Sequence, residues 1–233
     1  MLELQSISKT FHPGTIHAKK ALQNLSLSLN DGDFVTVIGG NGAGKSTLLN
    51  AIAGVWPVDE GNILIDGVDV TGLPEYKRAA FIGRVFQDPM LGTAPNMQIE
   101  ENLALALRRG KKRTLCWGVT KQEREDYYER LHALGLGLEK RMTDKVGLLS
   151  GGQRQALTLL MASLQKPKLL LLDEHTAALD PATAAKVLEL SDKIVEENGL
   201  TALMITHNMK DAIVHGNRLI MMNEGHIILD IEG

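Results

Sequence analysis

The residues with the clearest chemistry lie in one glycine-rich segment near the start of the chain. Gly39, Gly44, Lys45 and Ser46 have the spacing G-x-x-x-x-G-K-[ST]. Such a loop wraps phosphate groups with backbone N–H groups, which requires small residues and backbone angles that glycine reaches easily. We expect Lys45 to reach the β- and γ-phosphates of a nucleotide and the Ser46 hydroxyl to bind Mg²⁺. The alternative is a glycine-rich turn without a ligand. The predicted phosphate-binding residues are Gly39, Gly40, Asn41, Gly42, Ala43, Gly44, Lys45, Ser46 and Thr47.

The segments on either side of this loop are expected to hold it in place. Residues 34–38 (FVTVI) are typical of a buried strand, and residues 46–53 are typical of a helix that ends at Gly54. The N-terminus of that helix would add its partial positive charge beneath the phosphates.

A second group of residues supplies the acidic chemistry that a phosphate loop needs. Four consecutive leucines, residues 169–172, indicate a strand covered on both faces, and Asp173 and Glu174 follow it directly. Ligands bind at the carboxyl ends of such strands in open α/β sheets. We expect Asp173 to bind Mg²⁺ and Glu174 to orient and polarise the attacking water as a catalytic residue. The alternative is a strand that runs into an acidic turn.

A third segment, Leu149 to Gln153, precedes a predicted helix and offers a second set of backbone donors for an anion. This segment matches the signature sequence of the ATP-binding-cassette (ABC) ATPases residue for residue, and the chain resembles that family over nearly all of its length. In that family two cassettes enclose two ATP molecules, and the signature of one subunit caps the γ-phosphate held by the other. The resemblance therefore implies a homodimer in which Ser150, Gly151, Gly152 and Gln153 act on the partner's ATP.

Other roles follow from the resemblance alone, each with a simpler alternative. Gln87 matches a glutamine that contacts Mg²⁺ or the lytic water, although it could be a surface amide. His207 matches the switch histidine that contacts the γ-phosphate, a catalytic role, although it could be a satisfied histidine at a strand end. Phe11 stands where the family places a ring against adenine, and it could instead be core. Asp180 matches the loop that crosses the dimer interface. His175 departs from the pattern, because many relatives have proline there.

The fold implied by the resemblance is an α/β fold with a P-loop NTPase core and a mixed sheet, an N-terminal antiparallel β subdomain and an inserted α-helical subdomain. The sequence supports this division, because strand patterns such as Leu25, Leu27 and Leu29 give way to helical periodicity between about Pro89 and Gln165. We expect a single ABC ATPase domain over residues 1–233, with a core of 1–88 and 166–233 and a helical subdomain of 89–165. Hairpins are expected to turn at residues 66–67 and 223–225.

Composition limits the class of protein. With 233 residues, 44% hydrophobic and a net charge of −3, the chain is typical of a globular domain and has no global field that would attract nucleic acid. Cys116 is the only cysteine, so an intrachain disulfide is impossible and a reducing compartment is expected. The N-terminus does not have the pattern of a signal peptide, and no run approaches the roughly 20 apolar residues of a membrane span. Work at a membrane would therefore depend on a partner.

The function predicted from these features is ATP hydrolysis, with ATP and Mg²⁺ as cofactors, that drives a membrane transporter. Segments such as residues 84–89 and 173–180 resemble a bacterial importer group that pairs with branched-chain-amino-acid/ribose-type permeases, several of them associated with tryptophan or tyrosine. The implied partners are a second copy, integral-membrane permease subunits and an extracytoplasmic substrate-binding protein, with the chain peripheral on the cytoplasmic face of the membrane. Alternatives are an exporter or lipoprotein-release ATPase, a soluble ABC protein acting on ribosome or DNA, and a nucleotide-binding scaffold without activity.

Two further segments have open interpretations. Residues 108–113 (RRGKKR) form the one dense basic cluster, which is either a solvated loop or a contact for anionic lipid headgroups. Residues from Gln87 to Met97, including Met90 and Leu91, are expected to line a groove for a short permease helix, or else to fill the base of the helical lobe.

Overall fold

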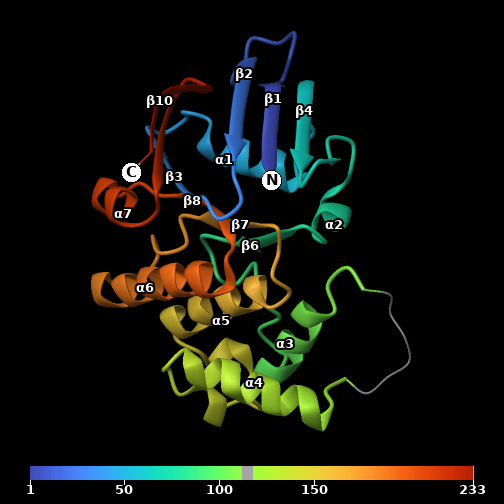
Figure 1. The fold of residues 1–233 in the computed structure, drawn as a ribbon, viewed down its shortest axis with the longest axis vertical. Helices are drawn as coiled ribbons and strands as arrows, with labels where there is room; N and C mark the ends of the chain where they lie inside the picture. Colours follow the sequence, from blue (N-terminus) through green and yellow to red (C-terminus); the bar gives the residue numbers. More distant parts are fainter. Residues whose placement is uncertain (112–117, 233) are drawn as a thin grey trace.

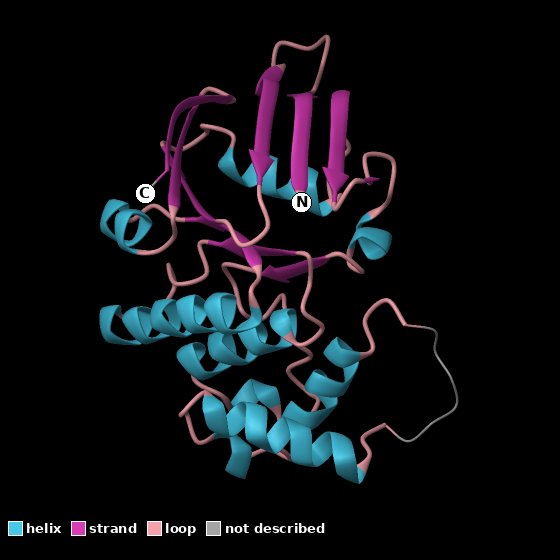
Figure 2. Cartoon of the chain, in the orientation of Figure 1, coloured by secondary structure: helices cyan, strands magenta, loops and turns pink. Residues whose placement is uncertain are grey.

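A computed structural model describes residues 1–111 and 118–232. Two sheets and a set of helices form the molecule, with the strands gathered towards one end and α3, α4 and α5 at the other (Figures 1 and 2). The strands are β1 (Leu2–Phe11), β2 (Lys19–Leu29), β3 (Phe34–Gly39), β4 (Glu60–Ile65), β5 (Val68–Asp69), β6 (Ile82–Val85), β7 (Leu169–Asp173), β8 (Thr201–Ile205), β9 (Arg218–Asn223) and β10 (His226–Glu232). The α-helices are α1 (Lys45–Ala53), α2 (Glu75–Arg78), α3 (Ile99–Leu107), α4 (Lys121–Ala133), α5 (Gly151–Ser163), α6 (Pro181–Asn198) and α7 (Met209–Val214).

The smaller sheet is antiparallel and has the strand order β2-β1-β4-β5. Leu25, Leu27 and Leu29 are buried while the serines between them are exposed, as the alternating pattern predicts. Asp66 and Gly67 form the turn between β4 and β5 with φ angles of 55° and 74°, which a tight two-residue hairpin requires.

The larger sheet has the order β10-β9-β3-β8-β7-β6 and is parallel except for the pairing of β10 with β9. The leucines of β7 alternate between its faces: Leu169 and Leu171 join the apolar cluster that contains α1, whereas Leu170 and Leu172 pack with residues of α5 and α6. Both faces of the strand are therefore covered by helices, which explains its continuous apolar sequence.

Helix α5 connects the sheet to the helical region. Its Leu159 packs with β7 and α6, whereas Leu157 and Leu160 pack with α3 and α4 around Leu103 and Leu131. The division into a core and a helical subdomain at residues 88 and 165 stays a prediction, because α5 packs with both the sheet and the helical region. No helix among the described residues is long and apolar enough to cross a membrane.

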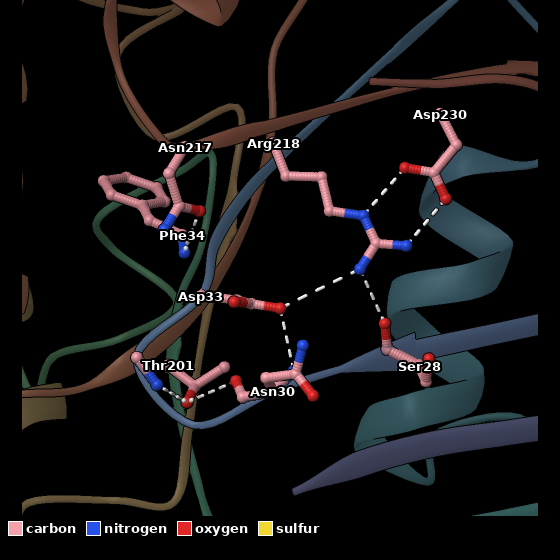
Figure 3. A network of polar contacts seen from close by, with 9 residues as sticks. Ser28, Asn30, Asp33, Phe34, Thr201, Asn217, Arg218 and Asp230 are labelled. Carbon is pink, nitrogen blue, oxygen red and sulfur yellow. Dashed lines mark hydrogen bonds and ion pairs between the residues drawn. The ribbon is translucent and has the colours of Figure 1, made fainter. Parts of the chain in front are cut away.

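A polar network around Arg218 connects the two sheets near the start of β3 (Figure 3). The guanidinium donates two hydrogen bonds of 2.7 Å to Asp230 on β10 and one of 2.8 Å to the carbonyl of Ser28 on β2. It also forms an ion pair of 3.8 Å with Asp33, directly before β3. Strands from both sheets are thereby held to the turn that leads into β3.

Candidate functional site

The site lies at the carboxyl edge of the parallel strands. Val37 of β3 pairs with Ile205 of β8, Asp173 of β7 pairs with the same Ile205, and Val85 of β6 pairs with Leu172. The four strands therefore end at one level. The loops that follow carry the phosphate-binding segment, His207, Glu174 and Gln87, so the sheet brings together segments that are far apart in the sequence.

Glycine is required at two positions of the phosphate loop. Gly39 has φ +152° and Gly44 has φ +106°, and a Cβ atom would lie 2.3 Å from the carbonyl oxygen of Met222 and 2.5 Å from that of Ala21, respectively. Gly44 is also the N-cap of α1, and no side chain caps that helix. The first backbone N–H groups of α1 are thus available to an anion, as the sequence predicts.

A hollow of about 370 Å³ lies above this loop. It brings together the predicted phosphate-binding and catalytic residues with two that the sequence analysis did not identify, Lys19 and Ala21. Its walls are Phe11, Lys19, Ala21, Asn41, Gly42, Ala43, Gly44, Lys45, Ser46, Thr47, Glu174 and His207. Gly39 and Gly40 contribute to the site through their carbonyl oxygens, which accept hydrogen bonds of 2.7 and 3.1 Å from Lys45 Nζ.

The charge of Lys45 is held inside the protein. Its side chain is buried, and burial lowers the pKa of the ammonium while the nearby carboxylate of Glu174 acts in the opposite direction. A desolvated ammonium is stabilised by an anionic partner, and with two N–H groups bound to carbonyl oxygens it has a third donor for a phosphate.

Glu174 and His207 form a pair at the rim of the hollow. His207 Nε2 lies 2.5 Å from Glu174 Oε1, a contact that is an ion pair when the imidazole is protonated. Glu174 has φ +46° and its N–H donates to the carbonyl of Ile205 at 3.0 Å. A non-glycine residue in this conformation is strained by about 1 kcal/mol, which the hydrogen bond to β8 offsets. The carboxylate can accept a proton from a water placed beside it.

The predicted Mg²⁺ ligands are divided between two hollows. Ser46 lines the hollow above the phosphate loop, whereas Asp173 and Gln87 line an adjoining one of about 640 Å³. A hydroxyl, a carboxylate and an amide oxygen are donors that suit Mg²⁺, which retains water and takes phosphate oxygens as further ligands. Within residues 1–111 and 118–232, no group of three or more His, Cys, Asp or Glu could hold a metal alone, so phosphate oxygens would complete the set.

The signature residues lie at the start of α5 and do not line the phosphate hollow of the same chain. Ser150 and Gln153 cap the helix reciprocally: Gln153 N donates to Ser150 Oγ at 3.3 Å and Ser150 N donates to Gln153 Oε1 at 3.2 Å. The segment packs against the start of α6, where Asp180 accepts from Thr183 N at 3.1 Å. Hydrogen bonds from the side chain and the backbone N–H of Thr183 lower the pKa of Asp180.

Gly152 is required for this contact. A Cβ atom on Gly152 would lie 2.1 Å from the γ-methyl of Thr183, and one on Gly151 would lie 3.3 Å from Leu179. The two glycines therefore allow α5 to approach α6 closely, a structural requirement that the spacing alone did not reveal.

The Phe11 ring packs against another aromatic ring of the same chain. Its ring makes an edge contact with Trp56, with centroids 5.0 Å apart and an interplanar angle of 83°. Lys9 Nζ lies 5.9 Å from the ring centroid. Because Phe11 also lines the phosphate hollow, it is available to stack on a base, which stays a prediction.

His175 is buried behind Glu174. Ser191 Oγ donates to the carbonyl of Val187, so its oxygen accepts from His175 Nε2 at 2.9 Å. Burial, and to a smaller extent the charge of His215, lowers the pKa of His175 to about 4. A neutral histidine thus replaces the expected proline and ties the loop after β7 to α6.

Comparison with known proteins establishes the family. A family model described as "ABC transporter" matches residues 22–177, more than half of the chain. The chain belongs to the ABC transporter family. It is 48% identical over 232 residues to a tyrosine transport ATP-binding protein of Clostridioides difficile (strain R20291), covering 100% of this chain and 92% of that protein. It is 35% identical to a spermidine/putrescine import ATP-binding protein of Pasteurella multocida (strain Pm70), over 99% of this chain and only 58% of that protein.

Solved structures give the same result for this ABC protein. A dimeric ATP-binding cassette in a post-hydrolysis state bound to ADP and Pi superimposes with a TM-score of 0.83 at 32% identity, covering 100% of this chain and 98% of that one. The ADP conformation of another ABC transporter cassette gives a TM-score of 0.82 at 30% identity, covering 100% and 91%. The predicted α/β cassette fold and the assignment as an ABC ATPase are confirmed. The roles of individual site residues stay predictions.

The contact between α5 and α6 can be tested by adding a single methyl group. We expect Gly152→Ala to lower the free energy of unfolding by roughly 1–3 kcal/mol, because overpacking against Thr183 outweighs the helix preference of alanine. Thr183→Ser removes the clashing methyl, so Gly152→Ala with Thr183→Ser should recover most of the loss. Urea denaturation of the four proteins measures the coupling, and a fully stable Gly152→Ala protein would contradict the account.

The burial of His175 predicts a pH dependence of stability. Below a pH of about 6.5 the unfolded chain protonates this histidine, whereas the folded chain resists protonation until about 4. The unfolded state then binds more protons, so stability falls as the pH decreases through this range, by roughly 3 kcal/mol at the acidic end. His175→Gln keeps a donor for Ser191 but cannot titrate. Its melting temperature should therefore fall less between pH 7 and pH 4.5 than that of the native protein. Parallel curves would show that His175 titrates normally.

Proposed function

We propose that this ABC ATPase hydrolyses Mg²⁺-bound ATP to drive an importer of a small amino-acid-like solute, with tyrosine or a similar amino acid as the leading class. The observation that carries the ATPase part is the hollow that joins Lys45, Ser46, Glu174 and His207. The solute class is supported by the 48% identity to a tyrosine transport ATP-binding protein over nearly the full length of both chains.

Binding of the nucleotide follows from the phosphate loop. Backbone N–H groups at the start of α1 and the ammonium of Lys45 would bind the β- and γ-phosphates, and Phe11 would stack on the base. Ser46, Asp173 and Gln87 would hold Mg²⁺, which when bound neutralises charge on the phosphates.

Hydrolysis is assigned to the pair at the rim of the hollow. The Glu174 carboxylate would accept the proton of the attacking water, and its strained backbone directs it towards the phosphate loop. His207 lies in contact with that carboxylate and would help to hold it in place. In this chain His207 is about half exposed, so it is also free to contact a γ-phosphate, as the family resemblance implies.

A second copy of the chain would complete the site. Ser150 and the first N–H groups of α5 form an anion site that is not part of the hollow above the phosphate loop of the same chain. In a pair of chains, the signature of one copy would face the phosphates of the other, with Asp180 at the interface. The dimeric state of a solved cassette at 32% identity supports this arrangement.

A permease would dock in a groove of about 1520 Å³. Leu91 and Met97, two of the residues expected to face the permease, line it, and Leu91 is 70% exposed. Met90 is not among its lining residues, and its sulfur contacts the Arg154 guanidinium. Docking of the permease in this groove would hold the chain on the cytoplasmic face of the membrane. The importer assignment also requires an extracytoplasmic substrate-binding protein. A nucleic-acid partner is not part of the proposal.

The basic cluster is only partly described. Arg108, Arg109 and Lys111 line the same groove, whereas Lys112 and Arg113 lie outside the described residues, as does Cys116. Arg108 is not a free cation, because it forms an ion pair of 2.8 Å with Glu123.

The assignment of Glu174 can be tested with an isosteric variant. Glu174→Gln should bind ATP as the native protein does but hydrolyse it about 10²–10⁴-fold more slowly, because an amide cannot accept the proton. Lys45→Ala should instead weaken ATP binding itself. Calorimetric binding and phosphate release measure the two effects, and native turnover by Glu174→Gln would exclude the proposed role.

The docking groove can be tested with a matched pair of exposed apolar residues. Leu91→Glu should leave the melting temperature unchanged, because the side chain is exposed, but abolish co-purification with the permease by burying an unpaired carboxylate. Ile213→Glu is the control, since Ile213 is 67% exposed on α7 and does not line the groove. Normal co-purification of folded Leu91→Glu would remove this residue from the docking surface.

A further inference from the structure

Arg84, on β6, is a buried arginine that the reaction described above does not use. Its side chain is 12% exposed. One terminal nitrogen donates to Asn50 Oδ1 at 2.9 Å and to Asp173 Oδ2 at 3.3 Å. The guanidinium carbon lies 4.6 Å from the ring centroid of Phe86, so the group is stacked as well as hydrogen-bonded.

These contacts connect the three segments that carry the predicted Mg²⁺ ligands. Asp173 is touched directly, and Ser46 is reached through Asn50, whose amide donates to the Ser46 carbonyl at 2.8 Å. Phe86, on which the guanidinium is stacked, directly precedes Gln87. A single cation therefore connects the three segments that would bind the metal.

Packing alone does not account for an arginine at this position. Its Nε is buried without a hydrogen-bond partner within the described structure, which makes the side chain more costly than an apolar residue of similar length. Arg84 also lines both the docking groove and the hollow that contains Asp173 and Gln87. Its charge is thus placed where it acts on the metal site.

We propose that Arg84 is a positioning residue that holds the Asp173 carboxylate and shares it with the bound metal, so that its charge weakens metal binding. Asn50 and Phe86 fix the guanidinium, and the guanidinium in turn fixes Oδ2 of Asp173. A divalent cation at this carboxylate meets a positive charge a few ångströms away, and the two repel. This inference rests on the proposed ATP site.

The test measures the contribution of the metal apart from activity. Titration calorimetry gives the Kd of ADP without Mn²⁺ and with Mn²⁺. The first constant divided by the second measures how much the metal tightens ADP binding. We expect Arg84→Gln to raise the ratio about three- to tenfold over the native protein, because the competing charge is removed. Arg84→Lys keeps the charge and should stay within about twofold of the native ratio.

Arg109→Gln is the matched control. Arg109 also lines the docking groove and also has a buried Nε without a partner, but its described hydrogen bond goes to the carbonyl of Ala162. Its ratio should equal that of the native protein. If Arg84→Gln does not fold, Arg84→Met keeps the contact with Phe86 and should show the same increase.

The outcomes separate the two proposals. A native or lowered ratio for folded Arg84→Gln or Arg84→Met overturns the role of Arg84 while leaving the ATP site intact. An absence of Mn²⁺-dependent ADP binding in the native protein would instead contradict the proposed function.

Discussion

Parallel pairing of β3, β8, β7 and β6 is the constraint on which the rest of the structure depends. Because these strands end at one level, the loops after them meet although Gly39 and His207, for example, are 168 positions apart in the sequence. The pairing in turn depends on helices covering both faces, as the alternating packing of Leu169 to Leu172 shows. The strained Glu174 and the glycines of the phosphate loop are tolerated where this rigid edge holds them.

Under the proposed function, the fold also explains why one chain alone holds an incomplete site. The phosphates would lie above α1, whereas the signature begins α5, which packs with α6 and the helical region. Gly152 allows α5 to lie close to Thr183, so the position of the signature is fixed by core packing. In the proposed arrangement, this helix start acts on a nucleotide that another copy presents.

The sequence predicts those parts of the fold and site in which local chemistry is sufficient. The phosphate loop and the turn at Asp66 depend on residues close in sequence, and the structure contains the predicted strand, helix and turn. No element was predicted for β6 or α7, because short segments carry little periodicity. Lys19 and Arg84 were missed for another reason: a lone basic residue gains meaning only from its neighbours in space.

The central claim, that each ATP site is built from two copies, is tested most directly by mixing two inactive proteins. Lys45→Ala lacks the lysine of the phosphate loop but keeps an intact signature. Ser150→Arg keeps the lysine but has an altered signature. A mixed pair contains one intact site, so the account predicts that an equimolar mixture regains ATP hydrolysis that neither protein shows alone. Lys45→Ala mixed with the double variant should remain inactive. A mixture of the two single variants that is no more active than its parts would contradict the account.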